Sequence, residues 1–274
     1  MNIRNIFLSI CACAAVLLAT SCETISEDER MTYVKPTDVK KHVLIEDFTG
    51  QLCRNCPEAT ATIHELQQQY GEDAVVAVGL YSGPFGKRTS GAYLSLTTAT
   101  GDYYYQQRGI SQQPSMMLDR KLIISDNSVL TARVNEYLGN EARAIMQLTS
   151  DYDSVSAKTI ISVAVEGIET STDARLQVWL MEDSITDAQI MPTGKTNKEY
   201  VHNHVFRTTV TDKDGVQIDV EQGQKVSEIF EATIDTTAWK PENMSVVAFV
   251  FDSNGVLQVL KTPLIEKNEG ETTE

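Results

Sequence analysis

Two cysteines three positions apart, Cys53 and Cys56, are the residues of this chain best suited to covalent chemistry. The stretch before them starts at Val43 as an apolar run, Gly50 breaks it, and a segment with helical spacing follows Pro57. A strand that delivers a Cys-x-x-Cys pair to the start of a helix is typical of a thiol–disulfide site. We therefore expect thiol–disulfide exchange at this pair, with protein thiols or protein disulfides as its partners.

The two cysteines would have different roles in such an exchange. Cys53 lies nearer the start of the helix, where the helix dipole and the neighbouring Arg54 would stabilise its thiolate, so it would be the attacking thiol. Cys56, one turn further on, would resolve the mixed disulfide. Arg54 and Asn55, which lie between the cysteines, would tune the redox behaviour of the pair.

Two other chemistries remain open for the same pair. A Cys-x-x-Cys can be half of a zinc site. No second such pair exists, so the remaining ligands would come from histidines: His42, His64, His202 or His204. Alternatively, Cys53 and Cys56 form a permanent structural disulfide, and the chain is a binding protein rather than an enzyme. We expect no cofactor and no resident metal.

The elements expected around the cysteines follow from the spacing of apolar residues. Helical spacing predicts a helix over 58–70, and the apolar run 74–81 predicts a buried strand, which gives a strand–helix–strand unit. Residues 82–100 are expected to be an insertion with a short helix at 92–96, followed by a helix at 102–108. A hairpin is expected at 115–125, and a last helix would run from Asn127 or Ser128 through Leu148, with Gly139 interrupting or kinking it.

Composition changes near Ser150, where β-branched alternation replaces helical spacing. Strands are expected at 159–165, 175–181, 205–211, 229–234, 246–251 and 256–260, with hairpin turns at Asp214–Gly215 and Asn254–Gly255. Six or seven short strands over this length are typical of an immunoglobulin-like β-sandwich. Period-two alternation in this half would place His202, His204 and Phe206 on one face. The two histidines would form a metal or partner site there, or they would organise a loop-to-strand junction.

The N-terminus is expected to target the chain for export and to anchor it to a membrane. Residues 6–19 are apolar and of signal-peptide length, and residues 17–22 resemble a bacterial lipobox that ends at Cys22. We expect a signal peptide at 1–21, lipidation at Cys22 with membrane anchoring through its acyl chains, and a flexible tether at 22–42. The acidic cluster 26–29 would be a surface-export signal or a solvated linker. Residues 268–274 would form an acidic tail.

The net charge and the positions of the cysteines limit which functions and which compartment the chain could have. The 274-residue chain carries a formal net charge of −15, which argues against nucleic-acid binding because such proteins present a basic face. Three of its five cysteines lie at or before Cys22, so the folded body keeps a single close pair. That usage suits an oxidising, extracytoplasmic compartment.

Together, Asp47, the Cys53–Cys56 segment and Pro114 make residues 43–149 resemble a thioredoxin-like domain. The resemblance implies that Asp47, six positions before the first cysteine, takes a proton from Cys56. It also implies that Pro114 is cis and keeps a strand edge open beside the redox pair. Leu52 departs from the family pattern, which has an aromatic residue there. The expected fold class is therefore α/β plus all-β: a thioredoxin-like domain, 43–149, followed by an immunoglobulin-like β-sandwich, 150–267.

The whole mature chain also resembles the outer-membrane-protein-28-related lipoproteins. The lipobox, the Phe-Thr-Gly…Cys-x-Asn-Cys-Pro string at 48–57, the stretch 109–114 and the motif 202–207 carry this resemblance. It implies an outer-membrane lipoprotein of the cell envelope, facing either the periplasm or the cell surface.

Overall fold

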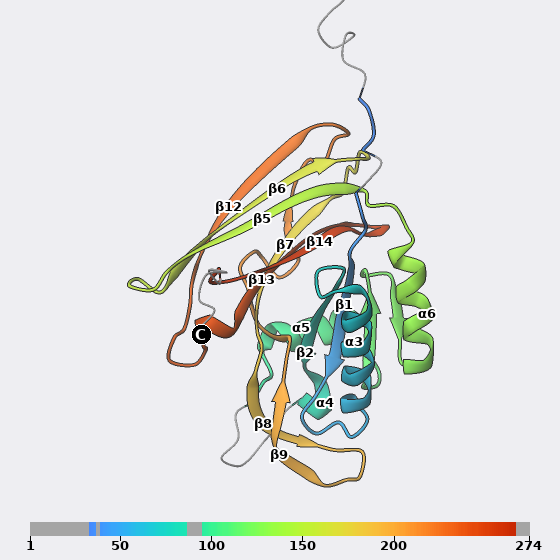
Figure 1. Cartoon of the computed structure of the whole chain (residues 1–274), viewed down its shortest axis with the longest axis vertical. Helices are drawn as coiled ribbons and strands as arrows, with labels where there is room; N and C mark the ends of the chain where they lie inside the picture. The colour runs from blue at the N-terminus through green and yellow to red at the C-terminus, as the bar shows by residue number, and fades with distance from the viewer. Residues whose placement is uncertain (1–32, 37–38, 87–94, 267–274) are drawn as a thin grey trace, which may run out of the picture. The chain divides into compact units, whose positions relative to one another are not determined.

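The computed structural model describes residues 33–36, 39–86 and 95–266 (Figure 1). The described residues from Pro36 onwards form one compact unit. Its first half contains these elements: β1 (Val43–Thr49), α3 (Cys56–Tyr70), β2 (Val75–Tyr81), α4 (Gly83–Gly86), α5 (Ala99–Gln107), β3 (Ser115–Leu118), β4 (Leu122–Ile124) and α6 (Asn127–Leu138). The expected strand–helix–strand order around the cysteines is confirmed, with β1 and β2 paired in parallel.

The second half is almost entirely β. Its elements are β5 (Ala144–Asp153), β6 (Lys158–Gly167), β7 (Arg175–Glu182), β8 (Ile185–Ile190), β9 (Thr196–His202), β10 (Val205–Thr209), β11 (Val216–Gln217), β12 (Lys225–Thr233), the 3-10 helix η1 (Pro241–Asn243), β13 (Met244–Asp252) and β14 (Gly255–Pro263). Three strands, β12, β6 and β5, form a separate sheet that Figure 1 shows as a layer of its own, and β8 and β9 form a hairpin.

The largest sheet takes strands from both halves of the sequence. Its order is β14-β13-β7-β10-β2-β1-β3-β4, with β11 paired to β7. The two halves meet where Val205 of β10 pairs with Gly79 of β2. The sheet therefore continues across the point where two separate domains were expected.

The fold class expected from the sequence is wrong. The chain is mostly β, and one nine-stranded sheet runs through both halves, so it is not a thioredoxin-like α/β domain followed by a separate sandwich. The physical reason lies in the core. One face of β1 and β2 packs against large side chains from later strands, among them Trp179, Phe206 and Phe249. The side chains that close this core come from both halves of the sequence.

Three large hydrophobic clusters, and a small fourth one that contains Tyr81 and Val205, lie around this sheet. One lies between β1–β4 and the helices α3 and α6 and contains Ile45, Ile63 and Leu130. The second, on the other face of β1 and β2, includes Tyr104 of α5 and the aromatic residues of β7, β10 and β13. The third joins β7, β13 and β14 to the three-stranded sheet. Side chains at alternate positions of β1 therefore enter two different cores.

The expected helix from Asn127 to Leu148 ends ten residues early. Asp126 caps α6 with a side-chain hydrogen bond to the Ser128 amide, and Gly139 follows its last turn. Residues 144–153 instead form β5, in which buried and more exposed positions largely alternate. Part of the expected helix at 92–96 lies outside the described residues. The helix expected at 102–108 is α5 and begins three residues earlier.

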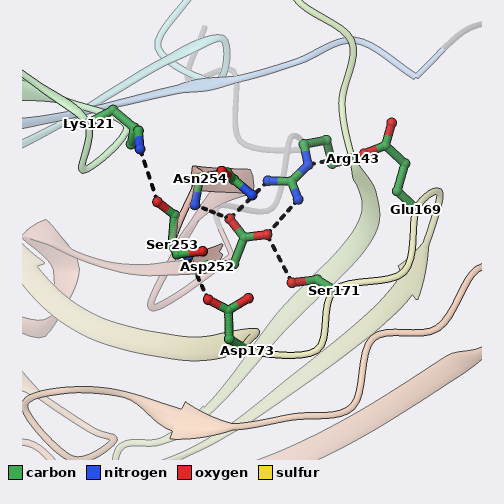
Figure 2. Close-up of polar contacts among 8 residues, drawn as sticks. All are labelled: Lys121, Arg143, Glu169, Ser171, Asp173, Asp252, Ser253 and Asn254. Carbon is green, nitrogen blue, oxygen red and sulfur yellow. Dashed lines mark hydrogen bonds and ion pairs between the residues drawn. The ribbon is translucent and has the colours of Figure 1, made fainter.

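A polar cluster fixes the start of β5 against the β13–β14 turn (Figure 2). Arg143 donates two hydrogen bonds to Asp252, from Nη1 to Oδ1 at 3.0 Å and from Nη2 to Oδ2 at 2.5 Å. Ser171 donates to the same carboxylate at 2.9 Å. Burial raises the pKa of Asp252, but these hydrogen bonds outweigh burial and the pKa is lowered. The link that follows α6 is thus tied to the β13–β14 turn by a bidentate, charge-assisted contact.

Candidate functional site

The Cys53–Cys56 pair lies between the end of β1 and the first turn of α3. The two sulfur atoms form a disulfide, with an S–S distance of 2.10 Å. Gly50 makes the turn possible, because a Cβ at this position would lie 2.4 Å from backbone atoms of Phe85. The amide of Leu52 donates to the Phe85 carbonyl at 2.9 Å, which holds the turn against α4.

Both cysteines are buried, and the two residues between them are exposed. Cys53 is 3% exposed and Cys56 is 2% exposed, so burial does not distinguish the attacking thiol expected from the sequence. Arg54 and Asn55 face solvent. Asn55 precedes α3 without a side-chain capping bond, and Pro57 occupies its first turn. The free N–H groups and the dipole at this end of α3 favour a thiolate whenever the disulfide is open.

The β8–β9 hairpin covers the disulfide. The side-chain amide of Gln189 donates to the carbonyl of Cys53 at 2.9 Å and lies 3.3 Å from the carbonyl of Gly50. The backbone amide of Ile190 donates to the carbonyl of Gln51 at 2.9 Å. A Cβ placed on Gly194, at the tip of the hairpin, would lie 3.3 Å from the Arg54 guanidinium. The hairpin therefore follows the chain around the cysteines from Gly50 to Arg54.

Asp47 lies on β1, on the side of the sheet that α3 covers. Neighbours with the same parity, such as Val43 and Ile45, pack against α3, whereas Leu44 and Phe48 enter the opposite core. Asp47 is buried, and its Oδ1 has no hydrogen-bond partner. Burial raises the pKa of this carboxyl from 3.8 to about 7. A carboxyl of this kind can gain or lose a proton near neutral pH.

Pro114 lies at the same end of β1 as the disulfide. The Gln113–Pro114 peptide bond is cis, as the resemblance to thioredoxin-like domains implied. The next residue, Ser115, begins β3 and pairs with Phe48. The Gln113 side chain donates to the carbonyls of Thr49 at 2.7 Å and Ser82 at 3.0 Å, which ties this loop to the ends of β1 and β2.

The two histidines of the 202–207 motif do not share one strand face. His202 ends β9 and is 1% exposed. His204 has a positive φ of 59° and lies between β9 and β10, so the period-two alternation stops between them. His202 contacts the Tyr81 hydroxyl, whereas His204 contacts Asp183 and Gln67. Within the described ranges, no group of three His, Cys, Asp or Glu side chains is arranged to hold a metal ion.

The sequence analysis missed three residues at this site: Tyr81, Gln189 and Tyr200. Tyr81 is the last residue of a recognisable buried strand, but nothing local distinguishes it from the apolar residues before it. Gln189 and Tyr200 belong to the hairpin. A turn signal, Pro192-Thr193-Gly194, lies between its two strands and would have indicated them.

A match to a family model over residues 101–268 shows the family to which the chain belongs. Residues 101–268, more than half of the chain, match the model of the family described as Outer membrane protein Omp28. The chain belongs to the Omp28 family of outer-membrane proteins, and the predicted outer-membrane location is confirmed. The match begins after Cys56, so it carries no information about the disulfide. No curated protein matches the sequence.

Two of the solved structures that resemble this chain come from Porphyromonas gingivalis and Agrobacterium tumefaciens. HBP35 of Porphyromonas gingivalis has a TM-score of 0.64 at 15% identity, and the match covers 85% of this chain and 81% of that one. Protein AGR_C_4864 from Agrobacterium tumefaciens has a TM-score of 0.51 at 15% identity, covering 88% of this chain and 99% of that one. At these identities the similarity shows a shared fold and nothing about activity.

The predictions about membrane anchoring concern the N-terminal segment. Cys22, the expected lipidation site, lies outside the described residues. Among the helices that the structure does describe, none combines the length and the apolar character needed to span a bilayer. Lipidation at Cys22 stays a prediction.

Proposed function

We propose that this outer-membrane protein is anchored through a lipidated Cys22 and exchanges disulfides with extracytoplasmic proteins at Cys53–Cys56. The observation that carries the proposal is the buried Asp47 carboxyl, which has a pKa of about 7 and lies on the α3 side of β1. Buried acids with pKa values near neutrality are concentrated at functional sites, because burial of a carboxyl without a partner is otherwise costly.

The exchange uses the two cysteine sulfur atoms and one group that donates a proton in one direction and accepts it in the other. A client thiolate attacks Sγ of Cys53, the Cys53–Cys56 bond breaks, and Cys56 leaves as a thiolate that takes the proton of the Asp47 carboxyl. A second client thiolate then attacks the client sulfur of the mixed disulfide and releases Cys53 as a thiolate, which the α3 dipole stabilises. The client gains a disulfide, and the protein is left with a thiol at Cys56 and a thiolate at Cys53. The reverse sequence reduces a client disulfide and returns the proton to Asp47.

A groove next to the disulfide offers room for a client chain. It has a volume of about 360 Å³ and lies between the first turns of α3 and the β8–β9 hairpin. Its lining includes Pro57 and Thr60 from α3, together with Met191 and Tyr200 from the hairpin. An extended client segment in this groove would lie beside the residue that follows Cys56.

A second function has its own supporting observation. Both cysteines are almost completely buried, and the Cys53 carbonyl is held by Gln189. A disulfide closed off in this way fits a binding lipoprotein in which the bond only stabilises the start of α3. Disulfides of that kind have reduction potentials below about −300 mV.

Client trapping in intact cells tests the first function. In the full-length Cys56→Ser variant, Cys53 has no resolving thiol, so mixed disulfides with client proteins should accumulate and be released by reductant. The Cys53→Ser variant, matched in position and size, should trap far less. Absence of trapped clients, together with a redox titration that places the pair below about −300 mV, would establish the structural role instead.

A further inference from the structure

Two buried side chains that form a hydrogen-bonded pair, Tyr81 and His202, lie beside Asp47. The Tyr81 hydroxyl is 2.7 Å from Nδ1 of His202. The two residues are 7% and 1% exposed. Tyr81 comes from β2 and His202 from the end of β9, so the hairpin that covers the disulfide also supplies one member of this pair.

The strand register places Tyr81 on the same side of the sheet as Asp47. Asp47 pairs with Gly79 of β2, and Tyr81 lies two positions further along that strand. Gly79 has no side chain to separate them, and the Tyr81 ring extends back over it, with Cε2 3.4 Å from where a Gly79 Cβ would lie. Burial raises the pKa of Tyr81 well above its ordinary value, and the charge of Asp47 raises it further.

The single proton of the Tyr81 hydroxyl has two possible acceptors nearby. Burial lowers the pKa of His202 to about 4, so its imidazole is neutral near pH 7 and one ring nitrogen is an acceptor. The other candidate is the Asp47 carboxyl, whose Oδ1 has no donor. The hydroxyl lies 2.7 Å from Nδ1 of His202. If Nδ1 is the unprotonated ring nitrogen, the hydroxyl donates its proton to the imidazole.

We propose that His202 is a positioning residue for Asp47: its Nδ1 accepts the Tyr81 hydroxyl proton and so keeps that hydroxyl from donating to the Asp47 carboxyl. The inference rests on the proposed function of Asp47 as the proton donor and acceptor for Cys56. A carboxylate that accepts a hydrogen bond is stabilised, and its pKa falls. By holding the Tyr81 proton, His202 leaves the carboxyl with a proton affinity near neutrality, where it can act in both directions of the exchange.

Three other residues near Asp47 do not take the place of the Tyr81–His202 pair in setting the pKa of its carboxyl. From β9, Tyr200 interacts electrostatically with Asp47, but its hydroxyl has a hydrogen-bond interaction with Thr60 of α3. From β3, the residue paired with Asp47 is Met116, which does not titrate. Glu46 lies next to Asp47 in the sequence, but its side chain lies on the opposite side of the sheet.

Further charged groups act on this cluster from other elements. Arg207 of β10 acts on Tyr81, whose pKa its charge lowers, and pairs with Glu182 at 2.8 Å. Arg120, the partner of Glu46, packs against Phe249 and Phe251 in the opposite core. Asp187 of β8 interacts with His202, where its charge opposes the effect of burial. The disulfide itself lies at the start of α3 and does not titrate while it is closed. Tyr81 is thus the donor whose hydrogen-bond direction decides the state of Asp47.

A pair of variants at His202 tests the proposal in the oxidised full-length protein. His202→Leu removes the acceptor, so the Tyr81 hydroxyl should turn to Asp47 and lower its pKa by about one unit or more, the effect of a hydrogen bond to a charged group. His202→Asn places an amide oxygen near the position of Nδ1 and should retain the wild-type pKa. The measurement is an NMR pH titration of the Asp47 carboxyl carbon, with His204→Leu as the control that should leave this pKa unchanged.

Two further measurements keep the proposal testable if His202→Leu does not fold. Nitrogen NMR shifts of wild-type His202 should show an unprotonated Nδ1 that accepts a hydrogen bond, and a protonated Nδ1 would overturn the proposal. Tyr81→Phe alone should leave the Asp47 pKa near its wild-type value, and a clear rise would show that Tyr81 donates to Asp47 already. Since these titrations need no client, their failure is separate from a failure to trap clients through Cys56→Ser.

Discussion

At the scale of single residues, Asp47 makes the stability of the protein depend on pH. Burial raises the pKa of its carboxyl from 3.8 to about 7 on folding. Between these values the folded chain binds a proton that the unfolded chain has released, so stability falls as the pH rises from about 4 to about 7 and levels off above that. A shift of about three units corresponds to a contribution on the order of 4 kcal/mol.

The Asp47→Asn variant removes this dependence. The free energy of unfolding is measured in urea for the variant and the wild type. The variant's value minus the wild-type value should increase by up to about 4 kcal/mol from pH 4 to pH 8, because only the wild type must bury a charge at the higher pH. Asp151→Asn, at an exposed position of β5, is the control and should follow the wild type. Equal pH profiles for Asp47→Asn and the wild type would show that Asp47 does not titrate in this range.

The chemistry-bearing residues close to one another in the sequence could be predicted, and their long-range partners could not. Cys53 and Cys56 were found from their spacing, and Asp47 from its offset to the first cysteine. Tyr81 and Gln189 acquire their roles only through hydrogen bonds that span more than a hundred residues, Tyr81 to His202 and Gln189 to Cys53. Local periodicity carries no information about such contacts.

At the scale of elements, the contacts of the β8–β9 hairpin with the chain around Cys53 predict that this hairpin limits access to the disulfide. Gln189 holds it against the carbonyls of Cys53 and Gly50. A typical hydrogen bond contributes about 1 kcal/mol net. In Gln189→Ala, opening of the hairpin should therefore be easier by about fivefold, and a small thiol reductant should reduce the disulfide faster by the same factor.

The measurement is the rate at which reductant-generated thiols are alkylated in the full-length protein. Gln222→Ala is the matched control, because Gln222 also donates from its side-chain amide to a carbonyl, that of Ile168, away from the site. That variant should react at the wild-type rate. If Gln189→Ala reacts no faster than the control, the hairpin does not limit access.

Local patterns in the sequence predicted most helices and strands. They did not predict where α6 ends and β5 begins, between the two halves of the sequence. The strands at 43–49 and 75–81 and helix α3 follow directly from apolar spacing. The helix expected to continue to Leu148 stops at Leu138 because Gly139 favours its termination and the residues from Ala144 pair with β6. In such a segment tertiary pairing decides between two structures that local preference leaves close in energy.

At the scale of the whole molecule, a buried ion pair lies where the two halves of the sequence share a core. Arg120 Nε is 3.5 Å from Glu46 Oε1, and the side chains are 4% and 0% exposed. The Arg120 guanidinium also lies 4.1 Å from the ring centre of Phe251 on β13. Burial lowers the pKa of Arg120 to about 10, which keeps it charged at neutral pH. No pattern in the sequence indicates this pairing, since arginine and glutamate are expected at the surface.

Removing one partner of this pair should destabilise the protein more than replacing both. Glu46→Gln leaves an uncompensated buried charge and should lower the free energy of unfolding by about 3–5 kcal/mol. Combining Glu46→Leu with Arg120→Met removes both charges and retains apolar volume, so its cost should be smaller than that of Glu46→Gln alone. Glu136→Gln, which breaks the exposed pair with Arg133, is the control and should cost less than about 1 kcal/mol. Urea unfolding of the four proteins measures these differences. A double variant less stable than Glu46→Gln would mean that the ion pair itself, rather than the packing around it, holds the two halves together.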